Sequence, residues 1–103
     1  MQCFTSSAIL AAMSDTKDGD EETQQICNQV KTMVEYNTKK TYEEFRAVQY
    51  KVQFVAGKNL FIKVHVGGDD YLHLNVFQVH LSDEKRLLHV LTDMGKEDPF
   101  TFF

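Results

Sequence analysis

The chain lacks tryptophan, has one proline and two cysteines, and contains no apolar run long enough to span a bilayer. The longest early apolar stretch, residues 8 to 13, is short, and no basic residue precedes it as a secretory signal requires. Cys3 and Cys27 could form only one bridge, and Cys3 lies in a segment with little reason to be ordered. We therefore expect reduced thiols in a cytoplasmic, or also nuclear, protein that has no signal peptide.

Positive charge is also scarce, with 11 Lys and Arg against 15 Asp and Glu and a net charge of −4. No run of Lys and Arg supplies the basic patch that nucleic acids or anionic lipids require, so we expect neither a nucleic-acid nor a membrane partner. A length of 103 residues leaves room for one domain with one hydrophobic core.

The first helix signal appears at Asp20. Residues 1–19 show no sustained periodicity and end in Ser, Asp and Gly, which predicts a flexible N-terminal trunk before a single domain over 20–103. Asp20 can cap a helix, and apolar residues then follow at helical spacing. These are Ile26, Val30, Met33 and Val34. The pattern predicts one amphipathic helix of about four turns, with Cys27 beside its apolar stripe.

After residue 41 the hydrophobic period falls to two, which is typical of strands. The alternating apolar residues are Val48, Tyr50, Val52 and Phe54, then Leu60, Ile62, Val64 and Val66, then Leu72, Leu74 and Val76. Residues 67–70, Gly-Gly-Asp-Asp, form the strongest turn signal, and residues 87–91 and 100–103 can supply one or two further strands. We therefore expect an α+β fold, with a four- to five-stranded antiparallel sheet wrapped around one long α-helix.

The sequence contains few residue patterns that could support catalysis. Gly67-Gly68 stands without the lysine and following helix of a phosphate loop, and Cys27 occupies a core position of the helix rather than a reactive one. If Val66 pairs with Leu72, His65 falls opposite His73, but two histidines do not make a metal site. We interpret them as a solvated cross-strand pair and expect no enzyme activity, no metal and no cofactor.

The segment from Lys51 to Gly57 reads Lys-Val-Gln-Phe-Val-Ala-Gly and falls between two predicted strands that follow a single helix. It resembles the Gln-x-Val-x-Gly signature of the cystatin superfamily. The flanking segments 47–51, 61–67 and 71–77, the helix segment 23–31 and the ending 100–103 resemble the stefins, the cytosolic type 1 cystatins. This similarity runs through residues 20–78 and is looser elsewhere.

The resemblance implies the cystatin fold and a reversible, competitive inhibitor of papain-like cysteine proteases such as cathepsins L, S, H and B. The family inserts a wedge of three parts into the active-site cleft. Here the first loop is Gln53, Phe54, Val55, Ala56 and Gly57, the N-terminal trunk is Ala11, Ala12 and Met13, and the second loop contains His80 and Leu81. A hairpin whose shape is set before binding loses little ordering entropy in the cleft.

Three features depart from the stefin pattern. Phe54 stands where valine is commonest, and the second loop reads Val79-His80-Leu81-Ser82 without the usual Leu-Pro. The trunk lacks its glycine: counting back from Ile26 aligns residues 11–14 with the trunk, whereas counting from the start sets Phe4 there.

Two alternatives and one question of chain length therefore stay open. The first is a cystatin-fold interaction protein that has lost protease affinity. The second is a monomer that self-associates, exchanging the helix and first strand in a domain-swapped dimer. Translation can begin at Met1 or at Met13.

Overall fold

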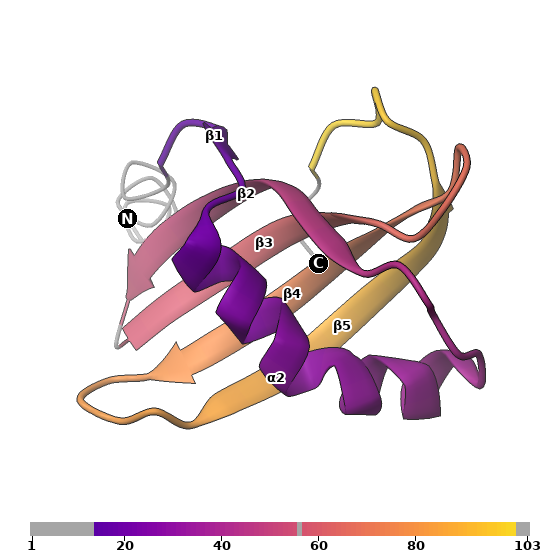
Figure 1. Ribbon diagram of the computed structural model, residues 1–103. Coiled ribbons are helices and arrows are strands. Elements are labelled where there is room, and N and C mark those ends of the chain that lie inside the picture. Colours follow the sequence, from indigo (N-terminus) through magenta and orange to yellow (C-terminus); the bar gives the residue numbers. More distant parts are fainter. Residues whose placement is uncertain (1–13, 56, 101–103) are drawn as a thin grey trace, which may run out of the picture.

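One helix crosses the concave face of a curved antiparallel sheet in this computed structural model, which describes residues 14–55 and 57–100 (Figure 1). The elements are β1 (Lys17–Asp18), α2 (Glu21–Thr38), β2 (Arg46–Val55), β3 (Gly57–His65), β4 (Tyr71–Val79) and β5 (Lys85–Met94). The five described strands are hydrogen-bonded in the order β1-β2-β3-β4-β5. The expected α+β fold is confirmed. No helix in the described ranges is long and apolar enough to cross a membrane.

Helix α2 begins where the sequence predicts. The Asp20 carboxylate accepts hydrogen bonds from the Thr23 backbone N–H at 2.8 Å and from the Thr23 hydroxyl at 2.6 Å, which satisfies a free donor of the first turn. The helix has 18 residues, about one turn more than expected, and ends at Lys39 in the left-handed conformation (φ 60°). Met33 is 41% exposed rather than part of the stripe, because it lies at the margin of the buried face.

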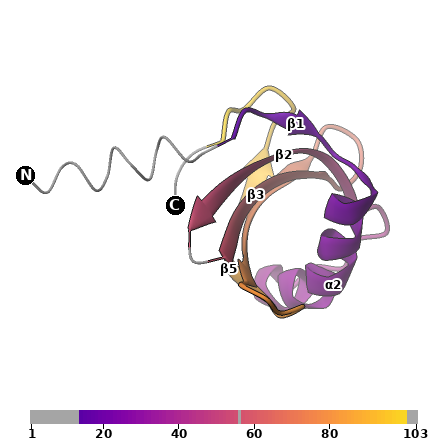
Figure 2. The same ribbon diagram turned by 90° about the vertical axis from the view of Figure 1, so that its left-hand side faces the viewer.

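The core lies between α2 and the inner face of the sheet, which Figure 2 shows curling around the helix. From the helix it contains Ile26, Cys27, Val30 and Val34, and from the central strands Val52, Leu60, Ile62, Val64, Leu72, Leu74 and Val76. The alternation in the sequence predicts all seven strand residues. Cys27 packs in this core, as expected, and burial raises the pKa of its thiol to about 12.

The segment from residue 14 to 19, which we expected to belong to a flexible trunk, is attached to the sheet. Lys17 and Asp18 form β1, opposite Tyr50 and Gln49 of β2. The Gly19 N–H donates to the Val48 carbonyl at 2.9 Å. Two paired residues leave too short a pattern for hydrophobic periodicity to detect. The fifth strand therefore lies at this edge, whereas Phe100, expected in a C-terminal strand, lies outside any strand and residues 101–103 fall outside the described residues.

Two local irregularities change the predicted faces and pairs. A β-bulge between Ala47 and Gln49 turns Ala47 to the core, so Val48 does not belong to the inner apolar set. In the β3–β4 hairpin Val64, not Val66, lies opposite Leu72, a shift of two residues that keeps the same side chains inside. The turn is centred on Gly68 rather than Asp69, because the Val66 N–H donates to the Asp70 carbonyl at 3.1 Å.

This register separates the two histidines that we expected to be partners. His65 lies opposite Tyr71, and His73 lies opposite Lys63 on the outer face. His73 is fully buried rather than solvated, because the Phe100 ring covers it with ring centroids 4.9 Å apart. Within the described ranges, no group of three or more His, Cys, Asp or Glu side chains is placed to hold a metal ion.

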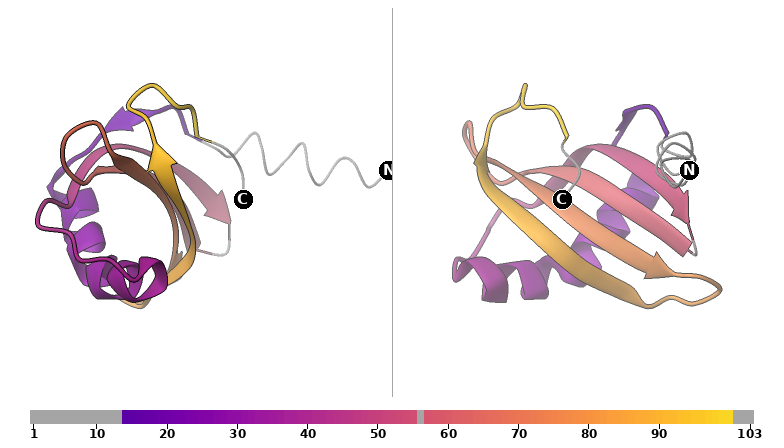
Figure 3. Two further views of the ribbon diagram at one scale, coloured as in Figure 1. Left: turned by 90° about the vertical axis from the view of Figure 1, so that its right-hand side faces the viewer. Right: turned by 180° about the vertical axis from the view of Figure 1, so that it is seen from behind.

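The segment after β5 turns back over the outer face of the sheet, as Figure 3 shows from behind. The Lys63 ammonium, whose residue is 4% exposed, donates to the Lys96 carbonyl at 2.6 Å and lies 5.7 Å from the centroid of the Phe100 ring. Neither ring nitrogen of His73 has a hydrogen-bond partner in the described part of the chain. The His73 imidazole therefore lies between the sheet and this segment.

The buried His73 predicts that acid destabilises the fold. Burial, and then repulsion from the Lys63 ammonium, lower the pKa of His73, and Asp98 opposes this shift. Between that lowered pKa and the ordinary value of about 6.5, the unfolded chain binds a proton that the folded chain does not, so the free energy of unfolding falls as the pH falls. His73→Phe, which keeps a ring against Phe100, should flatten this slope in urea unfolding below about pH 6.5.

The control for that measurement is His65→Gln. The Gly68 carbonyl, and then the Glu44 carboxylate, raise the pKa of His65. The contribution of His65 to the free energy of unfolding is therefore complete below about pH 6.5, and it is lost as the pH rises through the raised pKa. His65→Gln should leave the acid slope in place, and an unchanged acid slope in His73→Phe would contradict the prediction.

Candidate functional site

The hairpin that joins β2 to β3 presents apolar side chains at its tip. Phe54 pairs with Lys58 and Val55 with Gly57, and Ala56 falls outside the described residues. Phe54 is 57% exposed and Val55 is 46% exposed, although both are large hydrophobic residues. Exposed apolar side chains grouped at one tip indicate a contact surface. Gln53, which precedes them, is only 6% exposed.

Gly57 has no room for a side chain. Its backbone φ is +131°, and a Cβ at this position would lie 2.4 Å from the Gln78 carbonyl oxygen and 2.9 Å from the Phe77 ring. Only glycine fits, because the β3 backbone approaches β4 closely at this point and φ is positive. The sequence predicts a turn glycine here but not the contact with β4.

The second loop lies beside the first because Gly57 pairs with Val79, the last residue of β4. Residues 80–84 form this loop, which the Val79 N–H closes by donating to the Glu84 carbonyl at 3.0 Å. Leu81 has a positive φ of 58° and is 92% exposed. The structure therefore brings His80 and Leu81 to the same end of the sheet as Phe54 and Val55. We call these four residues the loop edge.

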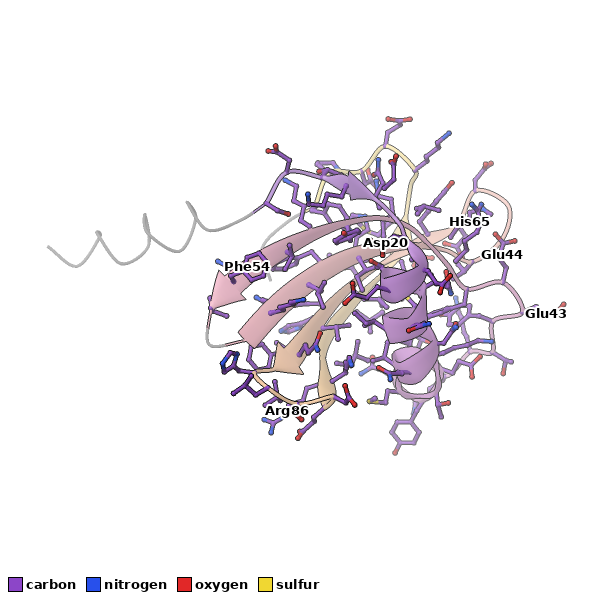
Figure 4. The ribbon with its side chains drawn as sticks, turned by 60° about the vertical axis from the view of Figure 1, so that its left-hand side comes forward. Asp20, Glu43, Glu44, Phe54, His65 and Arg86 are labelled. Atoms are coloured by element: carbon purple, nitrogen blue, oxygen red, sulfur yellow. The ribbon has the colours of Figure 1, made fainter. Side chains whose placement is uncertain are left out.

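A hollow of about 340 Å³ lies between the two loops. Its lining includes all four residues of the loop edge, together with Gly57, Lys58, Gln78 and Val79. Sequence reasoning missed Lys58 and Gln78, since these residues join this surface only through the pairing of β3 with β4. In Figure 4 Phe54 lies at one end of the sheet, and His65 and Glu44, which contact each other, lie at the other.

The third expected part, the trunk at Ala11, Ala12 and Met13, falls outside the described residues. Ser14, the next residue, is bound to β2: its N–H donates to the Val52 carbonyl at 2.8 Å, and its Oγ accepts from the Val52 N–H at 2.9 Å. Going from Asp18 back to Ser14, the chain follows β2 toward the hairpin tip. Ser14 and Phe54 line one hollow of about 350 Å³. The alignment of residues 11–14 with the trunk includes Ser14, but the sequence does not predict its hydrogen bonds to Val52.

Comparison with known proteins places this arrangement in a family. A family model described as a cystatin domain matches residues 11–90, a range that includes both loops. The chain is 43% identical over 97 residues to Cystatin-B of Homo sapiens, covering 92% of this chain and 99% of that protein. It is 41% identical over 97 residues to Leukocyte cysteine proteinase inhibitor 1 of Sus scrofa, covering 92% and 94%. The chain belongs to the cystatin family, as a type 1 cystatin, which confirms the resemblance found in the sequence.

Gly57 generates a prediction about stability, and Gly67 provides its matched control. Both have positive φ, +131° and +115°, but a Cβ at Gly67 would meet nothing within 4 Å. Gly67→Ala should cost about 1 to 2 kcal/mol from backbone strain alone. Gly57→Ala should cost a further 1 to 3 kcal/mol or so, because the methyl group overpacks against β4. Urea unfolding measures both losses of stability. Equal losses would show that β4 moves to accommodate the methyl group at position 57 without a further loss of stability.

Proposed function

We propose that this chain is a reversible, competitive inhibitor of papain-like cysteine proteases, and that the loop edge enters the active-site cleft as a wedge. Cathepsins L, S, H and B are the proposed targets. The trunk residues Ala11, Ala12 and Met13 are proposed to extend the same contact. The proposed compartment is the cytosol, or the nucleus, where a buried free thiol such as that of Cys27 stays reduced.

One observation carries this proposal: the pairing of Gly57 with Val79 joins the two loops before any partner binds. A contact surface that is already assembled loses little conformational entropy on binding. The surface consists of exposed Phe54, Val55 and Leu81, whose burial in a cleft is favourable by roughly 25 cal/mol for each Å² of apolar area. The name of the porcine relative, a cysteine proteinase inhibitor, supports the same partner class.

The geometry also accounts for an inhibitor that its target does not cleave. A protease substrate lies extended in the cleft, with its scissile bond open to the catalytic thiol. Here the first loop stays paired on both sides, Phe54 with Lys58 and Val55 with Gly57. The hairpin therefore fills the cleft as a closed turn instead of an extended segment.

Titration of papain with the purified chain tests the proposal. Activity against a small peptide substrate should fall to near zero at about one equivalent, and should return on dilution or on addition of excess substrate. Mass spectrometry should show the chain uncleaved in the 53–57 loop. If papain and cathepsin L stayed fully active with excess protein, the inhibitor proposal would be abandoned for a cystatin-fold interaction protein without protease affinity.

Val55→Asp should weaken inhibition strongly while leaving the fold intact. Val55 is 46% exposed in the free chain, so the carboxylate stays hydrated there, whereas binding would bury an unpaired charge. We expect a loss of roughly 100-fold or more, equivalent to about 2.7 kcal/mol. Met33→Asp is the control, since Met33 is 41% exposed but lies on α2 and lines neither hollow. Equal inhibition by both variants, with unchanged circular dichroism, would show that the loop is not the contact.

Removing residues 1–13 should weaken inhibition by about tenfold or less, equivalent to about 1.4 kcal/mol. Fixing each backbone residue in the cleft costs roughly 1 to 2 kcal/mol, which offsets much of the gain from burying Met13. Ala11→Gly with Ala12→Gly should tighten binding if residues 11–14 are the trunk, whereas no response would favour the register that sets Phe4 in the trunk. A loss of several orders of magnitude on truncation would contradict the prediction.

A further inference from the structure

The first residue of the Gln-x-Val-x-Gly segment does not share the exposure of its neighbours. Gln53 is 6% exposed, while Phe54 is 57% exposed and Val55 is 46% exposed. Alternation along β2 places the Gln53 side chain on the outer face of the sheet, opposite to the face that Val52 gives to the core. A side chain that is already buried in the free chain has little surface left to offer a protease.

Gln53 instead contacts the strand that leaves the loop. It lies directly opposite Asn59 of β3, and the Asn59 Nδ2 donates to the Gln53 Oε1 at 3.2 Å. Only the pairs Phe54 with Lys58 and Val55 with Gly57 lie between this bond and the hairpin tip. The amide pair therefore joins the two strands at the base of the loop.

We propose that Gln53 and Asn59 are positioning residues, which hold the first loop in its binding shape, and that the contact with the protease is made beyond them by the exposed residues of the tip. This inference rests on the proposed function. Gly57 holds the β3 side of the tip against the β4 backbone. The amide pair links β2, which contains Phe54 and Val55, to β3. Because β3 is fixed against β4, the end of β2 at the loop is fixed as well.

A buried oxygen atom of Asn59 supports a role for this pair. The Asn59 Oδ1 is buried and has no hydrogen-bond partner within the described part of the chain. An unsatisfied buried acceptor lowers stability, so an apolar residue at this position would avoid that cost. The Nδ2 of the same amide group makes the hydrogen bond across the base of the hairpin, and an apolar residue could not make this bond.

Association and dissociation rates separate positioning from contact. A positioning residue changes the fraction of molecules whose loop is ready to bind, and the apparent affinity falls by that fraction. Its loss therefore slows association. Loss of a contact residue instead speeds dissociation, as most interface mutations do. The two roles predict different kinetics for the same loss of affinity.

The experiment compares Asn59→Ala with Asn28→Ala by stopped-flow binding to papain. Asn28 accepts a similar amide bond, from Gln24 Nε2 at 3.1 Å, but lies exposed on α2. Asn59→Ala should slow association about tenfold with dissociation changed less than about twofold, and Asn28→Ala should change neither. Asn59→Gln, which keeps the amide donor, should recover most of the association rate. If Asn59→Ala does not fold, Asn59→Ser replaces it, since its hydroxyl has a shorter reach.

Hydrogen exchange of the free chain gives a second readout that does not depend on inhibition. The Phe54 and Val55 backbone amides should exchange faster in Asn59→Ala than in wild type, while the amides of α2 keep their rates. If wild type failed to inhibit papain, the proposed function would fall and this exchange would still test the positioning role. Unchanged exchange and association in Asn59→Ala, or a loss carried wholly by dissociation, would overturn the inference.

Discussion

The close approach of Gly57 to β4 is the constraint on which the functional end of this molecule depends. At this point the β3 backbone lies so near Gln78 that no Cβ fits, and Gly57 pairs with Val79. Because of this contact two loops that are far apart in the sequence become one surface. A side chain at position 57 would separate the strands where their loops begin. The first loop would then lose its support from the second without any change in its own residues.

Much of the fold follows from local patterns that agree with one another. Asp20 begins α2 as a cap, and alternating apolar residues identify three central strands and their inner face. These predictions succeed because each depends on a periodicity sustained over several residues. The failures are local. The bulge beside Val48 inserts one residue, β1 has two residues, and the pairing of β3 with β4 is shifted by two residues. None of these leaves a periodic signal, and each is decided by backbone hydrogen bonds to another segment.

The candidate site divides in the same way. The segment 53–57 can be found from its residues, since a glycine ends an apolar strand there. The resemblance to stefins adds His80 and Leu81, but only the pairing of β3 with β4 explains why these residues lie beside Val55. Lys58 and Gln78 join the site through the pairing of β3 with β4, and neither belongs to a motif. Exposure is also a tertiary property, which is why the burial of Gln53 could not be predicted from its place beside Phe54.

The two faces of the sheet therefore stabilise the fold through different interactions. The inner face is apolar and binds α2 through close packing, which stabilises the chain with little dependence on pH. The outer face buries Gln53, Lys63 and His73, whose polar groups must find partners or remain unsatisfied. A hydrogen bond from a buried amide or ammonium group is directional, so it specifies one conformation, whereas apolar packing is compatible with several. The amide pair of Gln53 and Asn59 lies on this outer face at the base of the hairpin, where its hydrogen bond sets a direction that apolar packing alone does not.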